Sequence, residues 1–238
     1  MIDCISVENM RQSDAWTIAN LVPSLELMGR AAEGVFRAVN WQGRAAIVVG
    51  SGNNGGDGFA LACILARHQI DCTVFTVSQR LSPDSAYYAE KTREAGVSVQ
   101  SFQPSCLEGY DMVVDCLLGT GFRGALRENY RSAIEAINAS GAYVVSVDIN
   151  SGMNGDSGDA ELAVRSDLTV TIGFVKNGLV TENAGAHMKR LVCTDIGIEL
   201  VKEENKICGM QEWMRLEDKT GVFLCPAWLD MNIIRAFP

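Results

Sequence analysis

The chain has 238 residues, enough for one domain of ordinary core size, and its 47% hydrophobic and 21% charged residues exclude a disordered or fibrous protein. Its 20 basic and 29 acidic residues give a net charge of −9 without a lysine or arginine cluster, so neither nucleic acid nor an anionic membrane surface is expected as a partner. No charged-then-apolar leader precedes Met10, and no apolar run approaches the roughly 18 residues of a membrane span, so we expect a cytoplasmic protein.

The predicted elements alternate between helices and strands after an opening pair of helices. Alternation of this kind implies parallel strands joined by right-handed crossovers, and near-continuous apolar strands imply helices on both faces. We predict a doubly wound, mostly parallel α/β sheet, which is a Rossmann-like three-layer αβα fold. Helices are expected over residues 6–20, 25–36, 59–68, 86–95 and 130–140, and strands over 45–49, 72–77, 97–102, 110–117, 143–149, 168–173 and 190–194.

A glycine-rich segment follows the first strand of this sheet. Residues 47–59 read IVVGSGNNGGDGF, so an apolar strand runs into a glycine turn, and helical spacing resumes at Phe59. Glycines let the backbone adopt positive φ and approach a ligand closely, and the following helix N-terminus offers free N–H groups and a partial positive charge. A phosphate or pyrophosphate group is the expected ligand.

The context of this turn differs from that of an ordinary NAD-binding unit. Gly50, Gly52 and Gly55 satisfy the generic dinucleotide spacing. Such a unit also carries an acidic residue about 20 residues on, at the end of the second strand, where it binds the ribose hydroxyls. Residues 73–79 contain no acidic residue. This disfavours an NAD-dependent oxidoreductase, as does the lack of a motif-placed histidine or tyrosine for hydride transfer.

Three loops are rich in glycine and polar residues, over 50–58, 115–124 and 148–158. Ligands of doubly wound folds bind beyond the carboxyl ends of the strands, so these loops are expected to converge on one crevice. Asp115 ends an apolar strand, where a carboxylate needs a cation or hydrogen-bond donors. Asp148 ends another, where partial desolvation would suit a general acid or base, although a turn cap is an equal interpretation. Arg123 either contacts a phosphate or lies in solvent.

Five motifs in a fixed order make a resemblance specific: GNNGGDGF, VVDCLLGTGFRG, VDINSG, DLTVTIGFVKNGL and TDIGI. Together with the opening helices, they resemble the NAD(P)H-hydrate epimerase family, also called the YjeF N-terminal domain family, over about residues 6–200. The resemblance implies an isomerase that interconverts the R and S epimers of hydrated NADH and NADPH (NADHX and NADPHX). It also implies functional coupling to a separate ATP- or ADP-dependent dehydratase that restores the cofactor from one epimer.

The residue types suit that reaction. The substrate carries a hydroxyl group at C6 of the nicotinamide ring, beside the ring nitrogen. When this hydroxyl is protonated, water departs, the nitrogen stabilises the resulting cation, and water can add again from either face. One group that alternates between acid and base is enough for such a route, and Asp148 suits it.

The resemblance also implies the remaining site residues. Lys176 matches a lysine of the family, although a solvated turn lysine is an equal interpretation. Asn54, Asp115 and Ser151 match the family's potassium ligands, which implies one K⁺ per subunit; a hard monovalent cation prefers such oxygen ligands. The substrate-binding residues expected from the motifs are Asn53, Asn54, Gly55, Gly56, Asp57, Gly119, Thr120, Gly121, Phe122, Arg123, Gly124, Ala125 and Asp148.

Two residues depart from the family pattern, and a C-terminal extension follows the region of resemblance. Ser51 and Asn150 stand where relatives commonly carry proline, and each is expected to loosen a turn. We divide the chain into an epimerase domain, residues 1–200, and a C-terminal extension of unknown role, residues 201–238. The extension contains several aromatic residues and is expected to pack either on its own domain or on the second subunit of a homodimer.

A non-catalytic nucleotide-binding or scaffold module on the same fold is the rival to an enzyme, because a fold can keep its crevice and lose its chemistry. The joint presence of Asn54, Asp115, Asp148 and Ser151 favours the enzyme.

Overall fold

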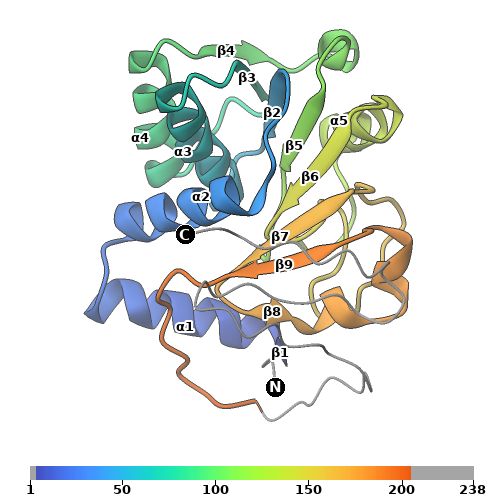
Figure 1. Ribbon diagram of the computed structural model, residues 1–238. Helices are drawn as coiled ribbons and strands as arrows, with labels where there is room; N and C mark the ends of the chain where they lie inside the picture. Colours follow the sequence, from blue (N-terminus) through green and yellow to red (C-terminus); the bar gives the residue numbers. More distant parts are fainter. Residues whose placement is uncertain (1–3, 205–238) are drawn as a thin grey trace.

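The computed structural model describes residues 4–204 of the chain (Figure 1). Of the predicted C-terminal extension, residues 205–238 lie outside the described residues. No helix within residues 4–204 is long and apolar enough to cross a membrane.

A parallel sheet of seven strands forms the centre of the fold, in the order β4-β3-β2-β5-β6-β7-β9. All pairings within it are parallel, and the central strands are fully buried, as their near-continuous apolar sequences predict. The predicted fold class is therefore confirmed. The strands are β2 (Ala45–Val49), β3 (Cys72–Thr76), β4 (Ser98–Ser101), β5 (Met112–Cys116), β6 (Tyr143–Val147), β7 (Leu168–Ile172) and β9 (Leu191–Thr194).

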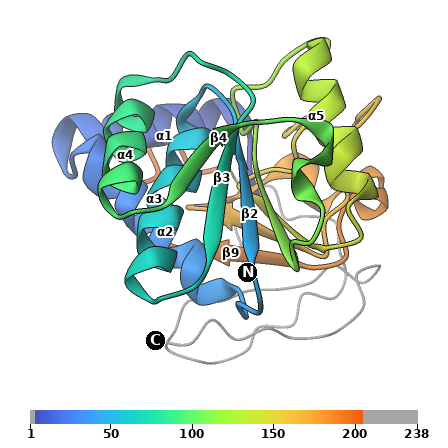
Figure 2. The same ribbon diagram turned by 90° about the horizontal axis from the view of Figure 1, so that it is seen from above.

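Helices cover both faces of this sheet. Figure 2 shows α2, α3 and α4 on one face and α5 on the other. Phe59 and Leu61 of α3 belong to the larger core on the first face, and Tyr130 and Ile134 of α5 to the smaller core on the second. The helices are α1 (Val7–Asn20), α2 (Ser24–Ala38), α3 (Asn53–Arg67), α4 (Pro83–Glu94) and α5 (Glu128–Ala139), with 3₁₀ turns η1 (Pro104–Leu107), η2 (Asn177–Val180) and η3 (Asn183–Ala186).

The chain reverses its direction across the sheet at β2. From β2 it moves outward through β3 to β4, and it then returns to β5 on the other side of β2 and continues through β6, β7 and β9. Gly50, after β2, donates a hydrogen bond from its N–H to the carbonyl oxygen of Cys116 at the end of β5 (3.1 Å). The glycine segment and the loop after β5 thus lie side by side at this switch point, which is where doubly wound folds bind ligands.

The glycine segment is helical over most of its length, which corrects the prediction that a turn extends to Phe59. Helix α3 begins at Asn53, and Gly50, Gly52, Gly55, Gly56 and Gly58 all have ordinary negative φ. A Cβ at Gly55 would lie 2.3 Å from the carbonyl oxygen of Gly50, and one at Gly58 would lie 2.8 Å from Val49 Cγ1. These glycines therefore let the start of α3 pack directly on the ends of β2 and β5.

Gly56 provides a test of this packing role. A Cβ there would lie 2.6 Å from Met28 Sδ on α2 and 2.8 Å from Ser85 Oγ on α4. Overpacking of this kind costs about 1–3 kcal/mol, so Gly56→Val should lower the free energy of unfolding by that amount in urea titrations. Gly52→Ala is the matched control, because a Cβ at Gly52 meets nothing within 4 Å. Equal stability of the two variants would contradict the interpretation.

A small second sheet, which the sequence analysis did not predict, joins the N-terminus to the end of β7. Strand β1 (Cys4–Ile5) pairs in parallel with β8 (Val175–Lys176), with Ile5 opposite Lys176. Helix α1 therefore begins beside the strand that carries Lys176 (Figure 1).

Polar contacts hold α1 along its inner face. Thr17 Oγ1 accepts a hydrogen bond from Glu199 N (3.0 Å), and Ser13 Oγ accepts one from Val201 N (3.2 Å). Asn9 Nδ2 donates one to the carbonyl oxygen of Lys202 (2.7 Å). Contacts with the segment after β9 thus fix the position of α1 against the rest of the domain.

Candidate active site

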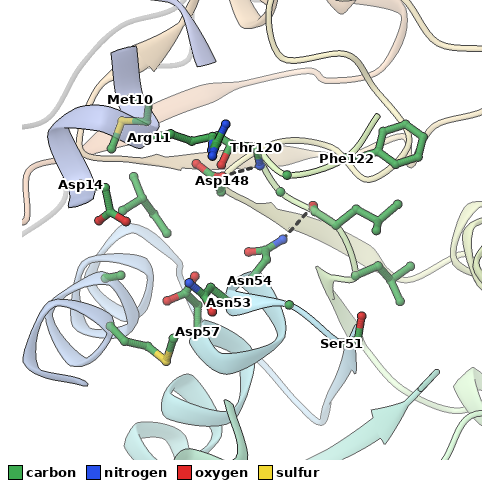
Figure 3. Close-up of a pocket in the computed structure, with 18 of the residues that line it drawn as sticks. Met10, Arg11, Asp14, Ser51, Asn53, Asn54, Asp57, Thr120, Phe122 and Asp148 are labelled. Atoms are coloured by element: carbon green, nitrogen blue, oxygen red, sulfur yellow. Dashed lines mark hydrogen bonds between the residues drawn. The ribbon is translucent and has the colours of Figure 1, made fainter. Parts of the chain in front are cut away.

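A cavity of about 680 Å³ opens at the carboxyl ends of β2, β5 and β6. Its volume is in the range of small-molecule sites. One wall consists of residues 51–54, 117–123 and 125–127, which belong to the glycine segment and the loop after β5. The other wall comes from α1, α2 and the segment after β9, and much of it is apolar (Figure 3).

Most of the predicted site residues line this cavity, and a few do not. Gly55 and Gly56 are buried inside the packing of α3, and Gly124 lines a neighbouring cavity of about 670 Å³. Asp115 and Ser151 are almost fully buried. The predicted residues that line the cavity are Asn53, Asn54, Asp57, Gly119, Thr120, Gly121, Phe122, Arg123, Ala125, Asp148 and Lys176.

Asp148 is the first residue after β6, and its backbone is in the left-handed region with φ 68°. This conformation is uncommon for a residue other than glycine, and such strain concentrates at functional sites. Its Oδ2 accepts a hydrogen bond from Thr120 N (3.3 Å), while a Cβ at Gly119 would lie only 3.0 Å from the same oxygen. Because Gly119 has no side chain, the Asp148 carboxylate has room to lie between the loops after β5 and β6.

Lys176 is fully buried, so its interpretation as a solvated turn lysine is wrong. Its Nζ donates hydrogen bonds to Asp148 Oδ1 (2.5 Å), to the carbonyl oxygen of Ile172 (2.7 Å) and to Thr171 Oγ1 (3.1 Å). All three donor hydrogens of the ammonium group are therefore used, and its charge is compensated by Asp148. The side chain of Asp148 is 13% exposed, so this ion pair has one side on the cavity.

Asp115 meets hydrogen-bond donors from three directions. Its carboxylate accepts hydrogen bonds from Ser146 Oγ (2.9 Å), from Leu117 N (3.2 Å) and from both N and Oγ of Ser151 (2.9 and 2.5 Å). Burial raises the pKa of Asp115, and the hydrogen bonds from Ser151, Leu117 and Ser146 oppose that rise. These donors satisfy the requirement that a carboxylate at the end of an apolar strand imposes.

Asn54 bridges the loops after β5 and β6. Its Nδ2 donates to the carbonyl oxygens of Leu118 (2.8 Å) and Val147 (3.1 Å). Its Oδ1 is buried and has no hydrogen-bond partner among the described residues. Ser151 Oγ lies 3.2 Å from the same Leu118 carbonyl oxygen. Several oxygen atoms, one of them unpaired, thus gather beneath the cavity.

Asp14 is a polar residue of the cavity that the sequence analysis missed. Burial and the charge of Asp148 raise the pKa of Asp14, and the charge of Lys176 lowers it. Asp14 lies one helical turn after Met10 in α1, and both line the cavity. The available signal was the polar inner face of α1, which carries Asn9, Ser13 and Thr17 in buried positions.

Comparison with known proteins identifies the family. The family model described as "YjeF-related protein N-terminus" matches residues 24–178. The chain belongs to the YjeF N-terminal family. The recognition made from the motifs is therefore confirmed.

Relatives of this YjeF-family chain fall into two lengths. It is 35% identical over 199 residues to the NAD(P)H-hydrate epimerase of Limosilactobacillus fermentum, a match that covers 80% of this chain and 95% of that protein. It is 37% identical over 191 residues to the Bifunctional NAD(P)H-hydrate repair enzyme Nnr of Archaeoglobus fulgidus, which covers 77% of this chain but only 39% of that protein. The chain thus spans about two-fifths of the bifunctional relative.

The fold is also that of a solved structure. The crystal structure of yeast ynu0, YNL200c, superposes with a TM-score of 0.71, covering 94% of this chain and 100% of the yeast chain. At 18% identity, this likeness supports the fold alone.

Ser51 and Asn150, which the sequence predicts to loosen their turns, both make hydrogen bonds in this YjeF-family chain. Ser51 contacts the Tyr130 hydroxyl through both N (3.2 Å) and Oγ (3.1 Å). Asn150 is buried and donates from Nδ2 to Val164 O, His187 O and Ser166 Oγ, while its Oδ1 accepts from Thr169 Oγ1 (2.6 Å). The Asn150 side chain therefore fixes the loop that carries Asp148.

Proposed function

We propose that this chain is an NAD(P)H-hydrate epimerase, which interconverts the R and S epimers of NADHX and NADPHX. The observation that carries the proposal is Asp148, a strained residue that is ion-paired with a buried lysine and faces a large cavity at the switch point of the sheet. The names of relatives that this chain covers over most of their length, from Limosilactobacillus fermentum and Rhodopirellula baltica, supply the substrate class.

Asp148 is the residue proposed to exchange a proton with the C6 hydroxyl group. Lys176 Nζ donates a hydrogen bond to Asp148 Oδ1. Lys176 thereby orients the carboxylate and compensates its charge while the substrate becomes a cation. Thr120 N fixes the other carboxylate oxygen, which leaves Asp148 little freedom to rotate away from the ring.

The nucleotide portion is proposed to bind along the polar wall. Because the whole chain has a net charge of −9, a dinucleotide must be attracted by local groups. The N-terminus of α3 at Asn53 provides free N–H groups and the positive end of the helix dipole. Arg123 also lines the cavity, and we assign it to a phosphate contact.

We further propose that Asn54, Asp115 and Ser151 hold one potassium ion per subunit. The unpaired Asn54 Oδ1, the Leu118 and Val147 carbonyl oxygens, the Ser151 hydroxyl and the buried Asp115 carboxylate fit a hard monovalent cation. No group of three or more His, Cys, Asp or Glu side chains within residues 4–204 is placed to hold a metal, in keeping with a site that uses a single carboxylate. The ion would neutralise Asp115 and brace the two loops.

Potassium should raise the thermal unfolding midpoint of the parent. A ligand at about 100 times its Kd stabilises the folded state by about 2.7 kcal/mol. The measurement is a thermal melt in potassium chloride against tetramethylammonium chloride at equal ionic strength. Asp115→Asn should lose the difference between the two salts. A parent midpoint that is the same in both salts would remove the potassium proposal.

The activity is tested with a mixture of both NADHX epimers and a dehydratase that accepts only one. Alone, the dehydratase should consume its own epimer and then slow to the rate of spontaneous epimerisation. With this chain added, both epimers should be consumed at one fast rate. A non-catalytic binding module would bind the mixture without changing the slow phase, which would overturn the proposal.

We also propose functional coupling to an ATP- or ADP-dependent dehydratase. The bifunctional names of the longer relatives support this coupling. The homodimer and the cytoplasmic location stay predictions.

A further inference from the structure

Epimerisation requires water to leave one face of the ring and to add to the other. Asp148 approaches the cavity from the end of β6, and Lys176 approaches it from β8. Figure 3 shows Asp148 above the open space, Asp57 of α3 below it and Asp14 of α1 at its side. A ring held in this space would have a carboxyl group on each face.

Asp57 and Asp14 are free to meet a ligand. Both are partly buried and line the cavity, and neither carboxyl group has a hydrogen bond or ion pair within the described part of the chain. Asp115 shows the contrast, because it does not line the cavity and its carboxylate accepts four hydrogen bonds from the protein. Polar groups that face a cavity and have no protein partner are the ones available to a substrate.

The surroundings of Asp57 favour a carboxyl group that keeps its proton. Burial is the largest cause that raises the pKa of Asp57, and the negative charges of Asp148 and Asp14 raise it further. The positive charge of Lys176 opposes the rise, but the pKa still lies well above its ordinary value. Tyr88 of α4 and Cys116 of β5 are the other titratable groups that interact with it. Such a rise favours the protonated form of the carboxyl group, which is the form that a general acid needs.

The same part of the cavity suits an uncharged ring. Apolar side chains from four segments line it beside the carboxyl groups, namely Met10, Leu27, Met28, Ile172, Ile196 and Ile198. They lower the polarity around the ring, which strengthens interactions between the carboxyl groups and a developing positive charge.

We propose that Asp57 is a second acid–base group that faces Asp148 across the ring, with Asp14 as its positioning residue. This inference rests on the proposed epimerase function. Each face of the hydrated ring then has its own group, Asp57 on one side and Asp148 with Lys176 on the other.

The proposed step is balanced in atoms and charge. Asp57 donates its proton to the C6 hydroxyl, the C6–O bond breaks with its electron pair on oxygen, and water departs as the N1 lone pair forms an N1=C6 bond. Water then forms a new C6–O bond on the opposite face, the N1=C6 electron pair returns to N1, and the proton of this water passes to Asp148. The reverse direction exchanges the two roles, and solvent restores the starting protonation.

Oxygen exchange with labelled water tests the chemistry at each face of the ring separately. Each NADHX epimer is incubated at neutral pH in H₂¹⁸O, and both epimerisation and ¹⁸O incorporation above the spontaneous rates are measured. Asp57→Asn should lower epimerisation by about 10²- to 10⁴-fold, while one epimer keeps exchanging its hydroxyl oxygen with retention at the Asp148 face. In Asp148→Asn, the other epimer should keep exchanging its hydroxyl oxygen, with retention, at the Asp57 face.

The outcomes are distinguishable. A parent that does not epimerise would overturn the proposed function. A parent that does, combined with parental epimerisation in Asp57→Asn or with loss of exchange in both epimers in that variant, would overturn the second acid–base group alone.

The role of Asp14 is tested by the pH dependence of the epimerisation rate. Asp14→Asn removes a negative charge that raises the pKa of Asp57, so epimerisation should decline at a lower pH on the alkaline side, with KM unchanged. Asp14→Glu should restore the parental profile. Asp84→Asn is the matched control, because Asp84 also lines the cavity but is not among the charges that shift Asp57. A parental profile in Asp14→Asn, or an equal shift in the control, would refute the positioning role.

Discussion

Asp148→Asn should lower the rate of epimerisation at neutral pH by about 10²- to 10⁴-fold, the usual contribution of general acid–base catalysis. Asparagine keeps the shape of the side chain, can accept the hydrogen bond from Thr120 N, and tolerates the left-handed backbone at φ 68°. The affinity for nucleotide should therefore survive while the proton acceptor is lost, although the folded state loses the stability that the Lys176–Asp148 ion pair provides. The measurement is the rate of conversion of one purified NADHX epimer.

The substrate also epimerises without enzyme, more readily in acid, so the quantity compared is the rate above this background. Asp71→Asn is a suitable control, since Asp71 is exposed and forms an ion pair with exposed Arg44 outside the cavity. If Asp148→Asn works as fast as the parent, Asp148 is merely a turn cap. Lys176 would then be the better candidate for proton transfer.

The central sheet could be predicted because its strands are buried on both faces. Strands such as β2 and β5 read as continuous apolar runs, and their ends are marked by polar residues. The beginning of α3 could not be predicted in the same way. Its glycines hide helical periodicity, and the reason for them is the close contact of the helix with Gly50 and Val49, which only the assembled fold contains.

The candidate site also contains residues that could be placed from the sequence and residues that could not. Asp115 lies near the end of β5 and Asp148 follows β6, two strands that the sequence reveals, so the convergence of their loops follows from the fold class. Lys176 could not be judged from sequence, because its burial depends on a two-residue pairing with β1, a segment about 170 residues away. The position of Asp14 depends on contacts between α1 and residues 199–202, and the polar face of α1 does not specify that this distant segment is its partner.

Lys176→Met should lower the free energy of unfolding by about 3 kcal/mol, the lower end of the range for removing one partner of a buried ion pair. Methionine fills a similar volume but leaves the Asp148 carboxylate without its counter-charge, and it also removes donors from Ile172 O and Thr171 Oγ1. The lower end applies because Asp148 opens on the cavity and can be hydrated from there. Urea titration measures the loss.

Two further variants isolate the electrostatic cause of that loss. Lys176→Met combined with Asp148→Asn should recover part of the stability, because no unpaired charge is left at the cavity wall. Lys189→Met removes a lysine whose side chain is 76% exposed and which pairs with Asp167, so it should cost no more than about 1 kcal/mol. Two outcomes would contradict this explanation: a double variant that is less stable than Lys176→Met, or an equal loss of stability in the two single lysine variants. Either would show that the buried Lys176–Asp148 ion pair does not stabilise the fold at this site.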